Sequence, residues 1–179
     1  MQTVCIYCGS SPGLNPAYLQ AATALGRAMA ERGLTIVYGG AHVGLMGAVA
    51  DAGLAAGGRV IGVIPEFLRD RELAHTGLSE LRIVASMHER KTLMAELADG
   101  FIALPGGLGT FEELFEMLTW AQLGFHAKPI GVLNTQGFYS PLFTLLETAA
   151  ANGFMGKGQP HLHRAADPQA LLDAMLGKL

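Results

Sequence analysis

Short apolar runs, most of them followed by glycine or proline, alternate with helical segments along almost the whole chain. Runs of this kind predict buried strands at 3–7, 35–38, 60–64, 81–85, 101–104 and 130–133. The helices are expected at 16–32, 44–56, 89–98, 111–123, 141–151 and from residue 168 onward. Buried strands that alternate with helices form parallel sheets covered on both faces. We therefore expect an α/β protein with an open, mostly parallel sheet.

Length and composition are those of one globular domain, 1–179. The chain has 179 residues, of which 50% are hydrophobic and 15% charged, and it shows no linker, repeat or low-complexity tract. A net charge of −3 argues against nucleic acid or an anionic membrane as a partner. The N-terminus lacks the features of a signal peptide, and polar residues and prolines interrupt the uncharged stretch 129–146. We expect a cytoplasmic protein.

Cys5 and Cys8 form a CxxC pattern, which in other settings marks redox or zinc sites. A zinc site needs about four ligands, and a redox pair needs an exposed helix N-terminus, whereas Cys5 lies inside an apolar run. We expect reduced cysteines in the core and at a strand end. His161 and His163 form HxH, but the nearest carboxylate, Asp167, is expected to cap a helix, so no metal site is predicted.

Three glycine-rich segments follow predicted strands: Gly9, Gly39–Gly40, and the glycines within 106–109. In open parallel sheets, ligands bind outside the carboxyl ends of the strands. These segments should therefore line one rim of the sheet. The segment YGGAHVGLMG, at 38–47, is open to a second interpretation, since its glycines also suit tight helix packing.

The strongest single motif is PGGLGTFEE at 105–113, which follows a strand and opens a helix. Glycines let a ligand approach the backbone, and a helix N-terminus offers unpaired N–H groups, so the motif predicts a phosphate site. The alternative is that Thr110 and Glu113 only form a capping box. The P-loop, GxGxxG, GxSxG and HExxH motifs are absent.

A second motif, MHERKTLM at 87–94, lies at a strand-to-helix junction. Arg90 and Lys91 are expected in the first helical turn, where cations are unfavourable unless they meet an anion. The guanidinium of Arg90 suits bidentate binding of phosphate or carboxylate. For Lys91, the alternative is a solvated pair with Glu89.

On these residues the sequence resembles the Lonely Guy (LOG) family of cytokinin riboside 5'-monophosphate phosphoribohydrolases. Residues 105–113 meet the family motif PGGxGTxxE in full, and Arg90–Lys91 meet the RK element of a second motif. YCGSS, YGGAHVGLMG and TWAQLG at 119–124 also look like family segments, so the resemblance covers nearly the whole chain. A departure is Ala41–His42, where relatives often carry Gly-Ser.

The resemblance implies a Rossmann-like three-layer homodimer that hydrolyses the N-glycosidic bond of adenine-type nucleoside 5'-monophosphates without a metal or redox cofactor. The products are the free base and ribose 5-phosphate. It implies Arg90 and Glu113 as catalytic residues. The substrate-binding residues it implies are Gly9, Ser10, Gly40, Glu72, Arg90, Lys91, Met94, Gly106, Gly107, Leu108, Gly109, Thr110, Phe111, Glu112, Glu113 and Thr119. Whether the natural substrate is a cytokinin nucleotide or AMP stays open.

This chemistry agrees with the residues, because N-ribosyl cleavage passes through an oxocarbenium-like state that a carboxylate such as Glu113 can stabilise. Arg90 could hold Glu113 ionised or position the substrate. Related proteins have been labelled lysine decarboxylases, but that reaction needs pyridoxal phosphate and a Schiff-base lysine, and only Lys91 lies beside a site motif. The other alternative is a nucleotide sensor or carrier of the same fold.

Apolar side chains cover more than one face of the predicted helix 111–123. Such a helix is usually buried on several sides, and a second subunit can supply the additional cover. The helix therefore favours a homodimer with its sites near the interface.

Overall fold

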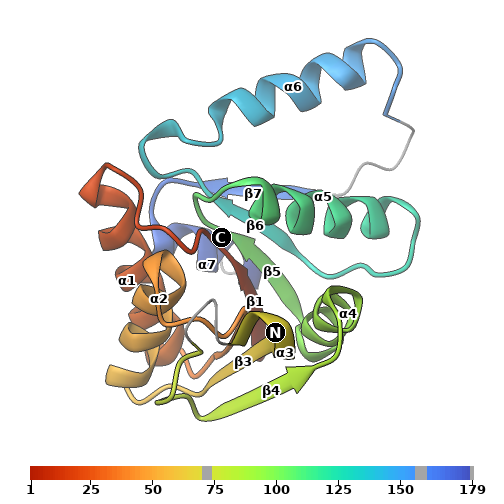
Figure 1. Ribbon diagram of the computed structural model, residues 1–179. Helices are drawn as coiled ribbons and strands as arrows, with labels where there is room; N and C mark the ends of the chain where they lie inside the picture. The colour runs from red at the N-terminus through yellow and green to blue at the C-terminus, as the bar shows by residue number, and fades with distance from the viewer. Residues whose placement is uncertain (70–73, 156–160, 178–179) are drawn as a thin grey trace.

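The computed structural model describes residues 1–69, 74–155 and 161–177. A parallel sheet runs through the molecule in the order β4-β3-β2-β1-β5-β6-β7 (Figure 1). Its strands are β1 (Thr3–Tyr7), β2 (Thr35–Tyr38), β3 (Val60–Pro65), β4 (Glu80–Val84), β5 (Gly100–Ala103), β6 (Ile130–Leu133) and β7 (Leu162–Ala165). The helices are α1 (Pro16–Glu31), α2 (Gly44–Ala55), α3 (Glu66–Arg69), α4 (Met87–Leu97), α5 (Leu108–Gln122), α6 (Ser140–Ala151) and α7 (Pro168–Leu176), with a 3-10 turn at Thr135–Gly137.

Helices cover both faces of this sheet. One apolar core joins α1, α2 and α7 to the strands through residues such as Leu25, Leu45 and Leu171. A second core, on the opposite face, includes Met94 of α4 and Leu114 of α5. All the strand pairs described are parallel. The expected Rossmann-like, three-layer α/β fold is therefore confirmed.

The strand order reverses direction at the centre of the sheet, between β1 and β5. The chain first builds outward from β1 to β4 and then crosses back to add β5 to β7 on the other side. Tyr7 of β1 is level with Ala103 of β5, and Ile6 is level with Tyr38 of β2, so these three strands end at nearly the same height. Such a reversal leaves a crevice at the carboxyl ends, where ligands of this fold class bind.

The predicted caps of the first and last helices are confirmed. Asn15 accepts a hydrogen bond from the N–H of Ala17 (2.9 Å), and Asp167 accepts one from the N–H of Ala170 (2.9 Å); each helix then begins with proline. Gly33, with φ of 69°, follows the end of α1 in the left-handed conformation that glycine adopts most easily.

Several element boundaries differ from the sequence prediction. α4 begins at Met87 and α5 at Leu108, two and three residues earlier than expected. Strand β7 and helix α3 were missed. β7 is an edge strand whose residues are only partly buried, so the sequence Leu162–Ala165 lacks the continuous apolar run on which the other strands were recognised.

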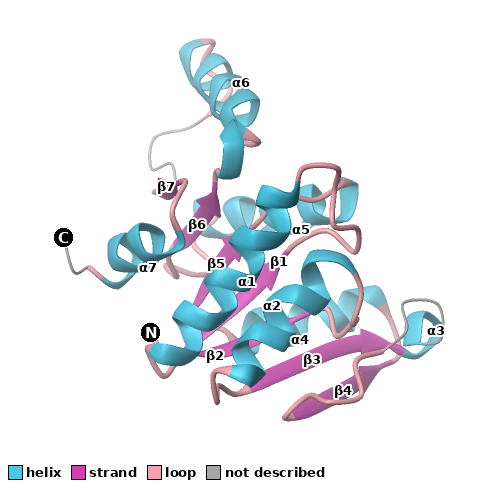
Figure 2. Cartoon of the chain, turned by 90° about the vertical axis from the view of Figure 1, so that its left-hand side faces the viewer, coloured by secondary structure: helices cyan, strands magenta, loops and turns pink. Residues whose placement is uncertain are grey.

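Helix α6 extends away from the layers that flank the sheet (Figure 2). It contains no buried residue, although it is as long as α2. In the described part of the chain, none of the helices combines the length and apolar character needed to cross a bilayer.

Candidate active site

The three glycine-rich strand ends meet at one rim, as predicted. The N–H of Gly9 donates to the carbonyl of Pro105 (3.1 Å), and the N–H of Leu45 donates to the carbonyl of Gly9 (3.1 Å). A Cβ on Gly9 would lie 3.3 Å from the Cα of Gly106, and one on Gly44 would lie 2.3 Å from the carbonyl carbon of Ser10. Backbones pack this closely only where side chains are absent.

Helix α5 begins within the PGG motif, with Gly107 as its N-cap and no side-chain cap. Its first helical hydrogen bond runs from the N–H of Phe111 to the carbonyl of Gly107 (3.0 Å). The capping-box interpretation of Thr110 and Glu113 is therefore wrong, because both residues lie inside the helix. A Cβ on Gly107 or Gly109 would meet nothing within 4 Å, so the start of α5 is open to an approaching group.

Arg90 is buried, with 3% of its surface exposed, and it is the fourth residue of α4 rather than a member of the first turn. Its Nε donates to the carbonyl of Val63 (3.1 Å), and its Nη2 donates to the carbonyl of Gly39 (2.9 Å). A Cβ on Gly39 would lie 2.1 Å from that Nη2, so glycine is needed for the guanidinium to fit. The ends of β2 and β3 thus hold the arginine.

Glu113 is also buried, with 8% exposed, and is the sixth residue of α5. Burial raises the pKa of the Cys8 thiol; the charge of Glu113 raises it further, and the charge of Arg90 opposes this. Both charges also act on Cys5. Glu113 and Arg90 therefore converge on the end of β1, the point where the strand order reverses.

The two cysteines are buried and reduced, as expected. Cys5 belongs to the core beneath α4 and α5, whereas Cys8 belongs to the core beneath α1 and α2. They therefore lie on opposite faces of the sheet.

Lys91 is 8% exposed and pairs with two carboxylates of α5. Its Nζ donates to Glu112 (2.5 Å) and to Glu116 (3.0 Å). The predicted alternative, a solvated pair with Glu89, is wrong. Glu89 instead lies at the start of α4, where its carboxylate accepts from the N–H of Ala85 (2.9 Å).

The other predicted substrate-binding residues are more dispersed. Ser10 and Leu108 are exposed at the rim, Gly40 is buried behind it, and Phe111 is half-buried against Phe138. Met94 is 1% exposed and belongs to the core beneath α4. Glu72 lies outside the described residues.

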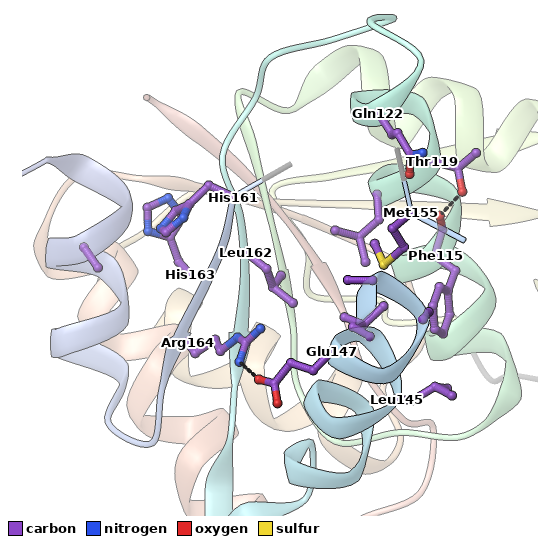
Figure 3. Close-up of a pocket in the computed structure, with 15 residues that line it drawn as sticks. Phe115, Thr119, Gln122, Leu145, Glu147, Met155, His161, Leu162, His163 and Arg164 are labelled. Atoms are coloured by element: carbon purple, nitrogen blue, oxygen red, sulfur yellow. Dashed lines mark hydrogen bonds and ion pairs between the residues drawn. The ribbon is translucent and has the colours of Figure 1, made fainter. Parts of the chain in front are cut away.

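Thr119 lies near the far end of α5, where its hydroxyl donates to the carbonyl of Phe115 (2.7 Å). It lines a groove of about 1120 Å³ between α5, α6 and β7, which we call the α5–α6 groove (Figure 3). Leu145 and Leu162 contribute apolar surface to it. His161 and His163 also line it, but no cluster of three metal-ligating side chains occurs among residues 1–69, 74–155 and 161–177.

Two contributors to the site were not predicted. Gly39 was noted only as a glycine, yet its carbonyl holds Arg90. Glu116 stands four residues after Glu112, a spacing that places both carboxylates on one face of a helix. The four-residue spacing of Glu112 and Glu116 could have indicated that they share a cation, but it does not identify that cation as Lys91.

Fold and site together define a Rossmann-like α/β protein with a buried arginine and a buried glutamate near the carboxyl ends of its central strands and an open helix start beside them. A family model described as "Possible lysine decarboxylase" matches residues 46–175. The chain is 54% identical over 155 residues to the cytokinin riboside 5'-monophosphate phosphoribohydrolase of Rhodococcoides fascians, covering 86% of this chain and 78% of that protein. It therefore belongs to the LOG family.

A plant relative agrees with this assignment, and a solved structure shares the fold. The cytokinin riboside 5'-monophosphate phosphoribohydrolase LOG of Oryza sativa is 51% identical over 154 residues, covering 86% of this chain and 64% of the rice protein. The Moco carrier protein of Chlamydomonas reinhardtii superposes with a TM-score of 0.73 over 99% of both chains, at 23% identity. At that identity the likeness shows the fold alone.

Proposed function

We propose that this protein hydrolyses the N-glycosidic bond of cytokinin riboside 5'-monophosphates and related adenine nucleotides, releasing the free base and ribose 5-phosphate. The observation that carries the proposal is the burial of two opposite charges at one end of the sheet. Arg90 is held by the strand-end carbonyls of Gly39 and Val63. Glu113 lies in the second turn of α5 behind its open start. Relatives at about half identity bear the name of this activity.

In this proposal the start of α5 binds the 5'-phosphate. The free N–H groups at a helix N-terminus favour an anion, and Gly107 and Gly109 leave the backbone accessible. The phosphate is remote from the bond that breaks, so its binding energy serves to orient the ribose.

The glycosidic bond then lies near Glu113. As the base departs, positive charge develops on the ribose ring, and a preorganised carboxylate stabilises that charge or orients the attacking water. Arg90 carries a positive charge and so does not itself stabilise that cation; in this proposal, fixed by two strand-end carbonyls, it holds Glu113 ionised or positions the substrate. These roles need no metal or redox cofactor.

The two alternatives have less support. A pyridoxal-dependent decarboxylase needs a lysine able to form an aldimine, whereas Lys91 is engaged by Glu112 and Glu116. A carrier or sensor of the same fold needs the phosphate-binding glycines but has no need of a buried Arg90 and Glu113, and burying charges is costly.

We further propose that the protein is a homodimer and that the α5–α6 groove lies in its interface. Leu145 is 60% exposed and Phe154 85% exposed, and α6 buries none of its own residues. An apolar surface of this kind is typical of an interface. Thr119 lines the groove, so α5 would run from the proposed site at its start to the interface near its end.

The substrate assignment is tested by measuring base release, by chromatography, from a cytokinin riboside 5'-monophosphate, from AMP and from the two nucleosides. We expect both nucleosides to react at least a hundredfold more slowly, in kcat/KM, than their monophosphates, since they lack the anchoring phosphate. GMP and CMP serve as base-side controls. Equal rates for AMP and adenosine would contradict phosphate anchoring at the start of α5.

A further inference from the structure

We propose that Lys91 is a positioning residue that locks α4 to α5 through Glu112 and Glu116, and does not bind the substrate phosphate. The inference rests on the proposed function, because it concerns how the helices that carry Arg90 and Glu113 are held relative to each other.

The bridge joins the immediate neighbours of the proposed catalytic pair. Lys91 follows Arg90 on α4, and Glu112 precedes Glu113 on α5. The Nζ of Lys91 donates to Oε1 of Glu112 and to Oε1 of Glu116, so it contacts α5 at two points one helical turn apart. Two contacts on one helix fix its rotation as well as its distance.

The bridge adds a directional, polar link to the apolar core that α4 and α5 share. α4 packs mainly on β1 to β4, and α5 packs mainly on β1 and β5, so β1 is the strand that supports both. A small rotation of either helix about its own axis would move Arg90 relative to Glu113. A displacement of about 1 Å at a reacting centre can lower the rate a hundredfold.

Local charge argues against phosphate binding by this lysine. One ammonium and two carboxylates leave a net charge of −1 around Nζ, which repels a phosphate dianion. Burial alone would lower the pKa of Lys91, but the hydrogen bonds and charges of Glu112 and Glu116 outweigh it, so the pKa is raised. The ammonium therefore stays charged and engaged by carboxylates.

The test compares Lys91→Gln, Glu112→Gln/Glu116→Gln and the neutral triple variant that combines them. A positioning role predicts that each variant loses roughly tenfold to a hundredfold in kcat. It also predicts that the triple variant loses no more kcat than the more impaired of Lys91→Gln and Glu112→Gln/Glu116→Gln. The reason is that all three variants remove the same bridge between α4 and α5. KM for the monophosphate in the triple variant should stay within about twofold of wild type, and Lys91→Arg should restore part of kcat.

Binding is measured separately, by calorimetry with ribose 5-phosphate, so that the result does not depend on turnover. Since the triple variant is neutral where the wild type carries −1, a positioning role predicts that its affinity is unchanged or higher. A tenfold loss of affinity in the triple variant, or unchanged kcat in the carboxylate double variant, would overturn the proposal.

Lys128 provides the matched control. Its Nζ donates to the carbonyl of Ala95 (2.7 Å) near the other end of α4. Lys128→Gln should lower the melting temperature and leave kcat unchanged. Failure of the proposed function would give a different result, namely no base release by the wild-type protein. The comparison of ribose 5-phosphate affinity between the wild type and the triple variant would still show whether Lys91 binds phosphate.

Discussion

The rim of the site and the α5–α6 groove are built in opposite ways, although α5 contributes to both. At the rim, backbones and buried charges are so close that a Cβ on Gly39 or Gly106 would lie 2.1 Å from a side-chain atom. Along the groove, α6 buries none of its residues, and Leu145 is 60% exposed. The rim is closely packed within the chain, whereas the described residues leave apolar surface exposed along the groove. Substitutions at the rim should therefore affect catalysis and folding, and substitutions on α6 should affect assembly.

The largest effect is expected at Glu113, where catalysis and stability should separate. Glu113→Gln keeps the shape of the side chain but removes the charge, so kcat should fall by roughly two orders of magnitude or more. The melting temperature should stay the same or rise, because a buried carboxylate is costly to desolvate and residue 113 does not cap α5. The measurements are kcat, the melting temperature and the affinity for AMP, all on one preparation of Glu113→Gln. A folded variant with near wild-type turnover would rule out the catalytic role.

The second-largest effect is expected at Gly106 and Gly109, two glycines of the PGGLGTFEE motif whose substitution should have different consequences. Gly106→Ala places a Cβ 2.1 Å from Oγ1 of Thr110 and 2.9 Å from the N of Gly9, and it should cost about 1–3 kcal/mol of stability. Gly109→Ala meets no atom within 4 Å and improves helix propensity, so its stability should be unchanged or higher. KM of the Gly109 variant for the monophosphate should nevertheless rise about tenfold, because the methyl group occupies the space proposed for phosphate. An unchanged KM would show that phosphate does not approach there.

The smallest effect is expected on α6. Leu145→Asp should weaken the proposed dimer by about tenfold or more in dissociation constant, roughly 1.4 kcal/mol, without lowering the stability of the single chain. Light scattering over a dilution series measures the change. Leu19, 42% exposed on α1, is the matched control, and Leu19→Asp should leave the mass unchanged. A wild-type protein that is monomeric at micromolar concentration would contradict the interface.

Much of the rim could be predicted from the sequence, because its determinants are local. Strands 3–7, 35–38 and 130–133 match β1, β2 and β6, and each glycine-rich segment follows its strand as expected. The starts of α4 and α5 were placed two and three residues late. For α4 the capping pattern Ser86-x-x-Glu89 was overlooked, whereas the N-cap of α5 is Gly107, which has no side chain to cap it. β7 was missed because an edge strand need not be apolar.

The sequence alone determined which residues the site can use, because hydrophobic period, caps and glycine positions act over a few residues. Only the tertiary structure decided how Arg90 and Lys91 are partnered. Arg90 is held by carbonyls of Gly39 and Val63, and Lys91 by carboxylates of α5, all more than twenty residues away in the chain. Such contacts depend on the order of strands in the sheet and on helix rotation, and no local pattern encodes either.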